Sequence, residues 1–269
     1  MNILEQIIEY KTSEVEKRKS KVSIAELEKR NFFPRKTLPL KDFLLDRSRT
    51  GIIAEFKRRS PSKGIINPDV DVVEVTKGFA DNGASGLSVL TDEHFFGGNE
   101  EDLIKARVNQ IPILRKDFII DEYQLIEAKS IGADVILLIA ACLSPAEVKR
   151  LAAFAKDLGL EVLLELHAEE ELDHICDETT VIGINNRNLK TFDVDIDRSL
   201  RMAEKIPLSK LKIAESGISS VENILLFKRH GFHGFLIGEN FMKAADPTIA
   251  FAEFVEALQT SLKGGLGES

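Results

Sequence analysis

A chain of 269 residues is near the upper limit for one hydrophobic core and has the usual size of a single α/β barrel. Its formal net charge of −8 argues against a general nucleic-acid binder, which would need a basic surface. Two widely separated cysteines, no evident signal peptide and no run of about 18 apolar residues argue against a disulfide framework, export and a membrane span. We therefore expect a reduced, cytoplasmic setting.

Residues 1–48 are predicted to form a helical extension ahead of the main domain. Five apolar residues recur near helical spacing: Ile3, Leu4, Ile7, Ile8 and Val15. The basic cluster from Lys17 to Lys21 is interpreted as a solvated helix end. A second apolar patch, between Phe32 and Leu44, needs a folded surface to cover. We expect the extension to lie across one end of the main domain and to reach its active site.

From Gly51 onward, short apolar runs typical of strands alternate with amphipathic helical stretches. The predicted strands are 52–56, 86–91, 111–114, 134–139, 161–166, 181–185, 211–215 and 235–238. The predicted helices are 72–82, 100–109, 123–131, 145–158, 169–176, 196–205, 221–229 and 247–262. Ser144 and Ser220 are predicted helix caps.

Eight β/α units in series favour a closed (β/α)8 TIM barrel with an N-terminal helical extension. The near-continuous apolar run at 135–139 fits a parallel sheet buried on both faces. No Gly-x-Gly-x-x-Gly follows the first strand, which disfavours an open dinucleotide-binding sheet. We assign residues 49–262 to a single catalytic barrel and expect 263–269 to be a flexible tail.

Polar residues end five of the predicted strands, where a barrel of this kind has its active site. They are Glu55 and Lys57, Lys116, Glu165, Asn185 and Arg187, and Glu215 and Ser216. In the first strand, alternation places Glu55 and Lys57 on the inner face with Ile53. Isolated buried charges are costly, so this pattern indicates a pocket in which lysine and glutamate act as acid and base. A structural network of ion pairs at the barrel rim is the alternative.

Two glycine-containing turns follow the seventh and eighth strands and favour phosphate binding. Ser216-Gly217-Ile218 and Gly238-Glu239-Asn240 each lead into a helix, whose first backbone N–H groups attract anions. Ser60 lies in a Ser-Pro-Ser-Lys-Gly loop that can close over this site. Phe95, Phe96 and Phe118 either stack on a planar substrate ring or line the core of the loops.

Metal and thiol chemistry are not indicated. The five histidines show no paired metal-ligand spacing, and His167 is interpreted as a loop residue or a neighbour of Glu165 that supports it. Cys142 has no evident basic partner in the sequence and is interpreted as a small buried residue. We expect neither a metal nor a cofactor.

Five motifs in this order resemble those of the indole-3-glycerol phosphate synthase family of tryptophan biosynthesis. They are Ala54-Glu55-Phe56-Lys57-Arg58-Arg59-Ser60-Pro61-Ser62-Lys63-Gly64, Ser88-Val89-Leu90-Thr91-Asp92-Glu93, Leu114-Arg115-Lys116-Asp117-Phe118, Gly183-Ile184-Asn185-Asn186-Arg187-Asn188-Leu189 and Glu215-Ser216-Gly217-Ile218. The resemblance covers essentially the whole chain, including the helical extension. It implies ring closure of 1-(2-carboxyphenylamino)-1-deoxyribulose 5-phosphate, with loss of carbon dioxide and water, to indole-3-glycerol phosphate.

The same resemblance implies roles for the polar residues. Lys116 is implied to be the general acid that protonates the substrate carbonyl as the ring carbon attacks it. Glu165 is implied to be the complementary acid/base or cation-stabilising carboxylate, and Lys57 to contact the substrate carboxylate and assist proton transfer. Four further residues are implied to orient these groups or complete the catalytic pocket: Glu55, Asn185, Glu215 and Ser216.

The implied substrate-binding residues divide by the part of the substrate that they contact. Arg187 is implied to neutralise the anthranilate carboxylate. The phosphate is assigned to Ser60, Gly217, Gly238 and Glu239. The expected apolar lining consists of Phe95, Phe96, Phe118, Leu137, Leu189 and Leu236.

Two other functions stay open on the sequence alone. Lys116 could form the Schiff base of a sugar-phosphate aldolase, because a barrel lysine in apolar surroundings can be nucleophilic. The chain could also be a phospho-ligand-binding barrel without catalysis. The expected partner is a phosphorylated small molecule, with no nucleic acid and no membrane. We expect a monofunctional monomer that associates at most weakly with other tryptophan-pathway enzymes.

Overall fold

The computed structural model describes residues 3–61, 63–188 and 193–264, and within them eight parallel strands close into a barrel. The barrel strands are β1 (Ile52–Phe56), β4 (Gly86–Leu90), β5 (Ile113–Lys116), β6 (Val135–Ile139), β7 (Glu161–Leu166), β8 (Val181–Asn185), β9 (Leu211–Glu215) and β10 (Phe232–Ile237). Each pairs with the next in chain order, and β10 pairs with β1. The prediction of a (β/α)8 barrel is confirmed.

Two of the predicted strand boundaries are wrong in an informative way. The third barrel strand is Ile113–Lys116, two residues later than expected. Pro112 has no N–H for the ladder, and the charged Arg115 and Lys116 belong to the strand itself because both are held by buried partners. The eighth strand begins at Phe232, and its register shifts between Phe232 and Gly234.

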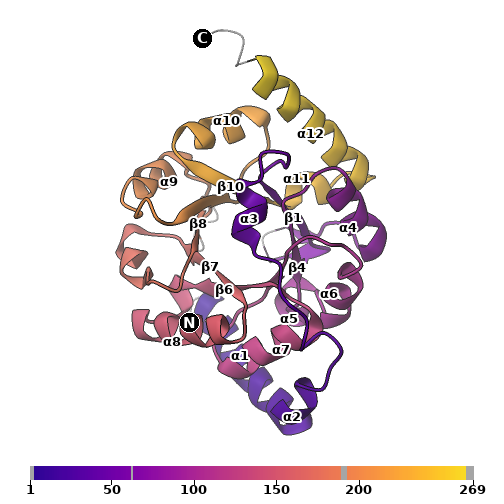
Figure 1. Cartoon of the computed structure of the whole chain (residues 1–269), viewed down its shortest axis with the longest axis vertical. Coiled ribbons are helices and arrows are strands. Elements are labelled where there is room, and N and C mark those ends of the chain that lie inside the picture. Colours follow the sequence, from indigo (N-terminus) through magenta and orange to yellow (C-terminus); the bar gives the residue numbers. More distant parts are fainter. Residues whose placement is uncertain (1–2, 62, 189–192, 265–269) are drawn as a thin grey trace.

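Helices surround the barrel, as Figure 1 shows. They are α4 (Val72–Asp81), α5 (Glu93–Phe96), α6 (Glu100–Ala106), α7 (Glu122–Ile131), α8 (Pro145–Asp157), α9 (Ile196–Ala203), α10 (Val221–Arg229), α11 (Glu239–Met242) and α12 (Pro247–Gly264). The segment predicted as a helix at 169–176 is a 3-10 helix, Glu169–His174. The caps at Ser144 and Ser220 are confirmed. Helix α12 includes the first two residues of the predicted tail, 263 and 264, and residues 265–269 lie outside the described part.

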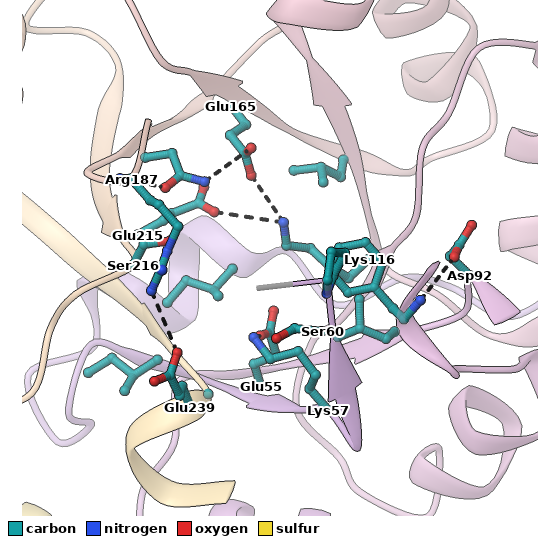
Figure 2. Close-up of a pocket in the computed structure, with 18 of the residues that line it drawn as sticks. Glu55, Lys57, Ser60, Asp92, Lys116, Glu165, Arg187, Glu215, Ser216 and Glu239 are labelled. Atoms are coloured by element: carbon teal, nitrogen blue, oxygen red, sulfur yellow. Dashed lines mark hydrogen bonds and ion pairs between the residues drawn. The ribbon is translucent and has the colours of Figure 1, made fainter. Parts of the chain in front are cut away.

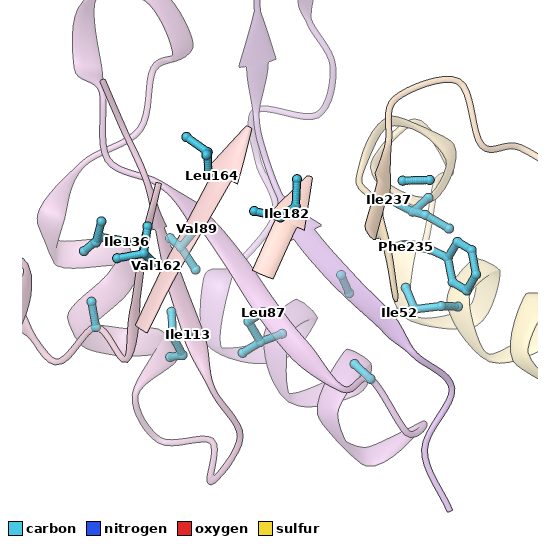
Figure 3. Packing of buried hydrophobic residues seen from close by; sticks show 14 of the residues in the cluster. Ile52, Leu87, Val89, Ile113, Ile136, Val162, Leu164, Ile182, Phe235 and Ile237 are labelled. Atoms are coloured by element: carbon cyan, nitrogen blue, oxygen red, sulfur yellow. The ribbon is translucent and has the colours of Figure 1, made fainter. Parts of the chain in front are cut away.

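The strand side chains divide into an outer and an inner apolar layer. The outer layer packs beneath the helices and includes Ile52, Leu87, Val89, Ile113, Ile136, Val162, Leu164, Ile182, Phe235 and Ile237 (Figure 3). The inner layer fills the barrel and includes Ile53, Leu114, Leu137, Leu163, Ile213 and Leu236. The alternation predicted for β1 is confirmed, since Ile52, Ala54 and Phe56 lie in the outer layer and Ile53 in the inner one.

The N-terminal extension covers both ends of the barrel. It contains α1 (Ile3–Lys21), α2 (Ile24–Leu27) and α3 (Leu40–Leu45). Helix α3 crosses the ring of strands in Figure 1 and places Leu40 and Leu44 in the inner layer. Room for them comes from Gly86 and Gly234, where a Cβ would lie 3.0 Å from Leu40 and 2.8 Å from Leu44.

Helix α1 lies at the opposite, C-terminal end of the strands. Its Lys11 contacts Asp92 and Asp117, which follow β4 and β5. The expectation that the extension lies across one end and reaches the active site fits α1 but leaves out α3 at the other end, because the two helices are joined by a segment long enough to pass along the barrel wall. Within the described residues, no helix is both long and apolar enough to span a membrane.

Candidate active site

A cavity of about 260 Å³ opens at the C-terminal ends of the barrel strands. The predicted catalytic residues all line it: Glu55, Lys57, Lys116, Glu165, Asn185, Glu215 and Ser216. So do most of the predicted substrate-binding residues: Ser60, Phe96, Phe118, Leu137, Arg187, Gly217, Leu236, Gly238 and Glu239. Figure 2 shows the polar groups converging from different strands.

One predicted binding residue that the structure describes does not line the cavity. Phe95 packs against Tyr10 and His94, with ring centroids 5.7 Å and 4.6 Å away, and the prediction that it contacts substrate is not supported by this position. Neighbouring residues of a helix point about 100° apart, so α5 turns Phe96 into the cavity and Phe95 toward α1. Leu189 lies outside the described residues.

Lys116 ends β5 and holds its ammonium between two glutamates. Its Nζ lies 3.0 Å from Oε2 of Glu165 on β7 and 4.0 Å from Oε2 of Glu215 on β9. Burial disfavours the charged ammonium, but the charges of Glu165, Glu215 and Glu55 outweigh that effect and raise the pKa of Lys116 above its usual value. Lys116 is therefore protonated at neutral pH and can donate a proton into the cavity.

The two glutamates beside Lys116 differ in protonation. Burial raises the pKa of both carboxyl groups, but Lys116 and then His167 bring the pKa of Glu165 well below its ordinary value. Burial and the neighbouring charge of Glu165 hold the pKa of Glu215 well above it. His167 Nε2 lies 3.0 Å from Glu165 Oε1, as expected for a supporting residue, and Asn185 donates to the same oxygen at 3.3 Å. The site thus pairs a charged carboxylate with a neutral carboxyl.

A second ion pair lies across the cavity at the end of β1. Lys57 Nζ donates to Glu55 Oε1 at 2.6 Å, so the inward acid and base of this strand satisfy each other. Two glycines make space for the buried carboxyl groups. A Cβ on Gly238 would lie 2.7 Å from Glu55 Oε1, and one on Gly183 would lie 2.0 Å from Glu215 Oε1. Any other residue at these positions would displace the acid that it faces.

The turn after β9 has an unusual backbone. Ser216 has a φ of 65° and is followed by Gly217 at 68°. A serine in this left-handed region is uncommon and costs energy, which is typical of functional sites. Asn186 Nδ2 donates to the Ser216 carbonyl at 2.7 Å and holds the turn. Gly217 is also required by space, because a Cβ would lie 2.4 Å from Val194.

The turn after β10 carries the other predicted phosphate-binding groups. Gly238 precedes α11, and Glu239 is its first residue. The Glu239 carboxylate lies 3.6 Å from Arg187 and 3.7 Å from Lys63, which belongs to the loop after β1. That loop forms a short hairpin of β2 (Arg59–Ser60) and β3 (Gly64–Ile65). Two cations and two glycine turns therefore meet at this end of the cavity.

Sequence reasoning missed part of the cavity wall. The residues without a predicted binding role that line it include Ile3, Leu4, Ile7, Asp92, Asp117 and Lys243. Asp92 and Asp117 stand at the ends of β4 and β5, so the rule that located Lys116 could have found them. Nothing in the sequence pattern separates the apolar residues of α1 that face the cavity from those that only pack.

Metal-ligand and thiol chemistry find little support in the described residues. No group of three or more His, Cys, Asp or Glu side chains in that part of the chain is arranged to hold a metal ion. Burial, followed by the charges of Glu165 and Glu171, raises the pKa of the Cys142 thiol to about 12. Cys142 is therefore a thiol at neutral pH, but its side chain is only partly buried against the core, so the interpretation as a buried residue holds in part.

Comparison with known proteins gives one consistent result. The family model described as indole-3-glycerol phosphate synthase matches residues 4–254. A protein of that name from Bacteroides thetaiotaomicron is 47% identical over 259 residues, covering 96% of this chain and 99% of its own length. Its namesake from Salinibacter ruber is 43% identical over 251 residues, covering 92% of this chain and 93% of its own.

Solved structures add agreement at the level of the fold. A mutant tryptophan synthase α-subunit from Pyrococcus furiosus superposes with a TM-score of 0.59, at 16% identity, over 78% of this chain and 98% of that chain. Matched over nearly its whole length by the family model and by these relatives, the chain belongs to the indole-3-glycerol phosphate synthase family.

Proposed function

We propose that the cavity closes the indole ring of 1-(2-carboxyphenylamino)-1-deoxyribulose 5-phosphate by acid–base catalysis from Lys116 and Glu165. Family membership makes the protein a carboxy-lyase of tryptophan biosynthesis. The observation that carries the assignment of roles is the position of Lys116. Its ammonium lies inside the cavity between Glu165 and Glu215, at the ends of three separate strands.

The chemistry needs a proton donor at the substrate carbonyl. As the aromatic carbon that bears the carboxylate attacks that carbonyl, a carbon–carbon bond forms and the ammonium of Lys116 protonates the oxygen. The ring now carries positive charge, which the Glu165 carboxylate stabilises. Cleavage of the bond to carbon dioxide returns an electron pair to the ring. Loss of a proton and departure of the protonated hydroxyl as water then give the indole.

The remaining polar groups are assigned to the two ends of the substrate. Lys57 and Arg187 are assigned to the carboxylate, and Lys57 assists proton transfer. To reach it, Arg187 must leave Glu239, its ion-pair partner beside the phosphate-binding turns. The turns at Gly217 and Gly238, with Ser60 above them, hold the phosphate. The Glu239 carboxylate pairs with Arg187 and Lys63, and an anionic substrate would attract the same two cations. Substrate binding therefore competes with this carboxylate.

Replacing Lys116 by alanine tests the assignment directly. A positioned general acid contributes roughly 10²- to 10⁴-fold, so Lys116→Ala is expected to lower kcat by that factor. The chain contains no tryptophan, so formation of the fluorescent indole can be followed against a low protein background. Lys212→Met is the matched control, since this largely buried lysine of β9 bonds backbone carbonyls away from the cavity. Normal turnover by Lys116→Ala would contradict the role.

The two alternative functions are less well supported. A Schiff-base lysine must attack as the neutral amine, whereas the carboxylates around Lys116 raise its pKa and keep it charged. Borohydride with a keto-sugar phosphate should therefore trap no covalent adduct. A binding barrel without catalysis has no need of the paired acid and base groups, and it would form no product in the fluorescence assay.

Assembly and cellular setting stay predictions. We propose a monomer that associates at most weakly with other enzymes of the pathway and works in the cytoplasm. Sedimentation of the purified chain tests the first point: a dimer at micromolar concentration would overturn it.

A further inference from the structure

Lys11 of α1 is a buried lysine outside the cavity wall. Its side chain is 1% exposed, and its Nζ lies 2.7 Å from Asp92, 2.9 Å from Asp117 and 2.6 Å from Glu14. The carboxylates of Asp92 and Asp117 are buried as completely as the ammonium. Burying three charges at one point is costly unless each has a partner. Contact with substrate does not account for this lysine, because it does not line the cavity.

One of its partners directly follows Lys116 in the chain. Asp117 Oδ1 faces Lys11, and its Oδ2 accepts hydrogen bonds from Thr91 at 2.7 Å and from Arg115 at 3.2 Å. The backbone N–H of Phe118 also donates to Oδ1 at 2.8 Å. The carboxylate therefore holds the backbone of the residue that follows it and the side chain of Arg115, two residues before it. A shift of Asp117 must move Lys116, its neighbour.

The other partner controls an aromatic part of the wall. Asp92 is the N-cap of α5, where its Oδ1 accepts from the backbone N–H groups of Phe95 at 2.7 Å and Phe96 at 3.2 Å. Its Oδ2 is the oxygen that Lys11 contacts. Phe96 lines the cavity and lies 6.0 Å from Phe118, ring centroid to centroid. Lys11 thus joins the strand end that carries Lys116 to the short helix that carries Phe96.

Lys11 lies on the same side of α1 as two residues that line the cavity. Leu4 and Ile7 precede it by seven and four residues, which places all three on one side of the helix. Leu4 and Ile7 line the cavity. The ion pairs of Lys11 with Asp92 and Asp117 consequently fix the position of Leu4 and Ile7 against the cavity.

We propose that Lys11 is a positioning residue for the reaction, which fixes Lys116, Phe96 and the apolar face of α1 relative to one another. The inference rests on the role proposed above for Lys116. Without the ammonium, two buried carboxylates face each other with no cation between them. Asp117 keeps its ion pair with Arg115, whereas Asp92 has no other ion pair among the described residues. Asp92 must then move, and α5 and the wall of the cavity move with it.

The test compares two cations of the same extension at opposite ends of the barrel. Lys11→Met removes the charge and keeps the length of the side chain. Arg35→Met is the matched control, because Arg35 lies 2.5 Å from the buried Asp134, just before β6, far from the C-terminal strand ends. Both variants are expected to lower Tm. Lys11→Met should also lower kcat by about 10- to 100-fold, as misplacement of a reacting group does, with a smaller change in KM.

Two more variants separate positioning from stability. Lys11→Arg keeps the charge and is expected to restore most of kcat. The double variant Lys11→Met/Asp92→Asn also removes the carboxylate that would lose its partner, so it should regain Tm but still have a low kcat. It also serves as the test protein if Lys11→Met alone does not fold.

The proposal is overturned if the double variant recovers parental kcat together with its Tm. It is equally overturned if Arg35→Met loses as much kcat as Lys11→Met. Failure of the proposed function is recognised separately, since the parent would then form no indole product, or Lys116→Ala would turn over normally.

Discussion

Glu165 and Glu215 are the same amino acid in the same cavity, but they are held in opposite protonation states. Lys116 lies 3.0 Å from Glu165 and 4.0 Å from Glu215, so the first glutamate has most of its attraction. Once Glu165 is charged, its field and the burial of Glu215 raise the pKa of the second group. A pair of environments that separates two pKa values in this way assigns the acid and base roles.

Replacing Glu165 by glutamine should therefore affect kcat differently from replacing Glu215 by glutamine. Glutamine resembles a neutral carboxyl group, so Glu215→Gln is expected to lower kcat by less than about tenfold. Glu165→Gln removes a charge that the reaction uses and should cost roughly 10²- to 10⁴-fold. Both are measured from indole formation at saturating substrate. Equal losses in the two variants would contradict the assigned protonation states.

What the sequence could predict at this scale follows from geometry. Parallel strands bring their C-terminal ends together, so Lys116, Glu165 and Glu215 could be grouped before any coordinates were known. Their protonation could not, because it depends on differences of about 1 Å between Lys116 and each carboxylate. The position of Lys11 cannot be predicted from the sequence, for another reason. It interrupts the apolar stripe of α1, and only its buried partners explain why a lysine stands there.

Among the elements, α3 has a purely structural position. Leu40 and Leu44 fill the N-terminal end of the barrel interior, with exposed fractions of 1% and 6%. In a (β/α)8 barrel this end contributes stability, and chemistry takes place at the other. Helices α1 and α3 come from the same extension but therefore serve different purposes.

Leu40→Ala should separate these purposes. The substitution leaves a cavity in a closed apolar layer and is expected to lower the free energy of unfolding by about 2–5 kcal/mol. It should leave kcat within about twofold of the parent at temperatures where the variant is folded. Denaturant unfolding and the fluorescence assay provide the two measurements. Leu208→Ala is the control, because this side chain is 98% exposed. A large loss of kcat in Leu40→Ala would show that the lower layer also positions the active site.

The order of the elements could be predicted from the sequence, and some of their boundaries could not. Apolar runs predict all eight strands but not the charged end of β5, because Arg115 and Lys116 do not resemble strand residues. Arg115 is fully buried and bonded to Glu127 and Asp117. A strand with partners for its charges can continue where periodicity suggests that it has ended.

At the scale of the whole molecule, the active site is a place where the fold gives up stability. Glu215 is 1% exposed, and its carboxyl group is neutral because burial and the neighbouring charge of Glu165 both raise its pKa. Such groups persist in enzymes because function requires them, and replacing them often stabilises the protein. The apolar layers of the barrel, together with α1 and α3, must supply the stability that the buried carboxyl group costs.

The stability lost by burying Glu215 depends on pH. In the unfolded chain Glu215 has a pKa near 4.3, and in the folded chain its pKa is raised. Between these two values the folded state keeps a proton that the unfolded state has lost, so rising pH favours unfolding through this group. Each unit by which the folded pKa exceeds the unfolded one corresponds to about 1.4 kcal/mol.

Glu215→Gln cannot ionise and should escape this cost. Its free energy of unfolding is expected to exceed that of the parent at pH 8, and the difference should shrink as the pH falls and vanish below about pH 4, where both states of the parent are protonated. Denaturant unfolding at several pH values measures it. Glu161→Gln is a useful comparison, because burial also raises the pKa of Glu161, which lies at the N-terminal end of β7 and away from the cavity. A gain for Glu215→Gln that did not vary with pH would mean that packing, and not ionisation, is responsible.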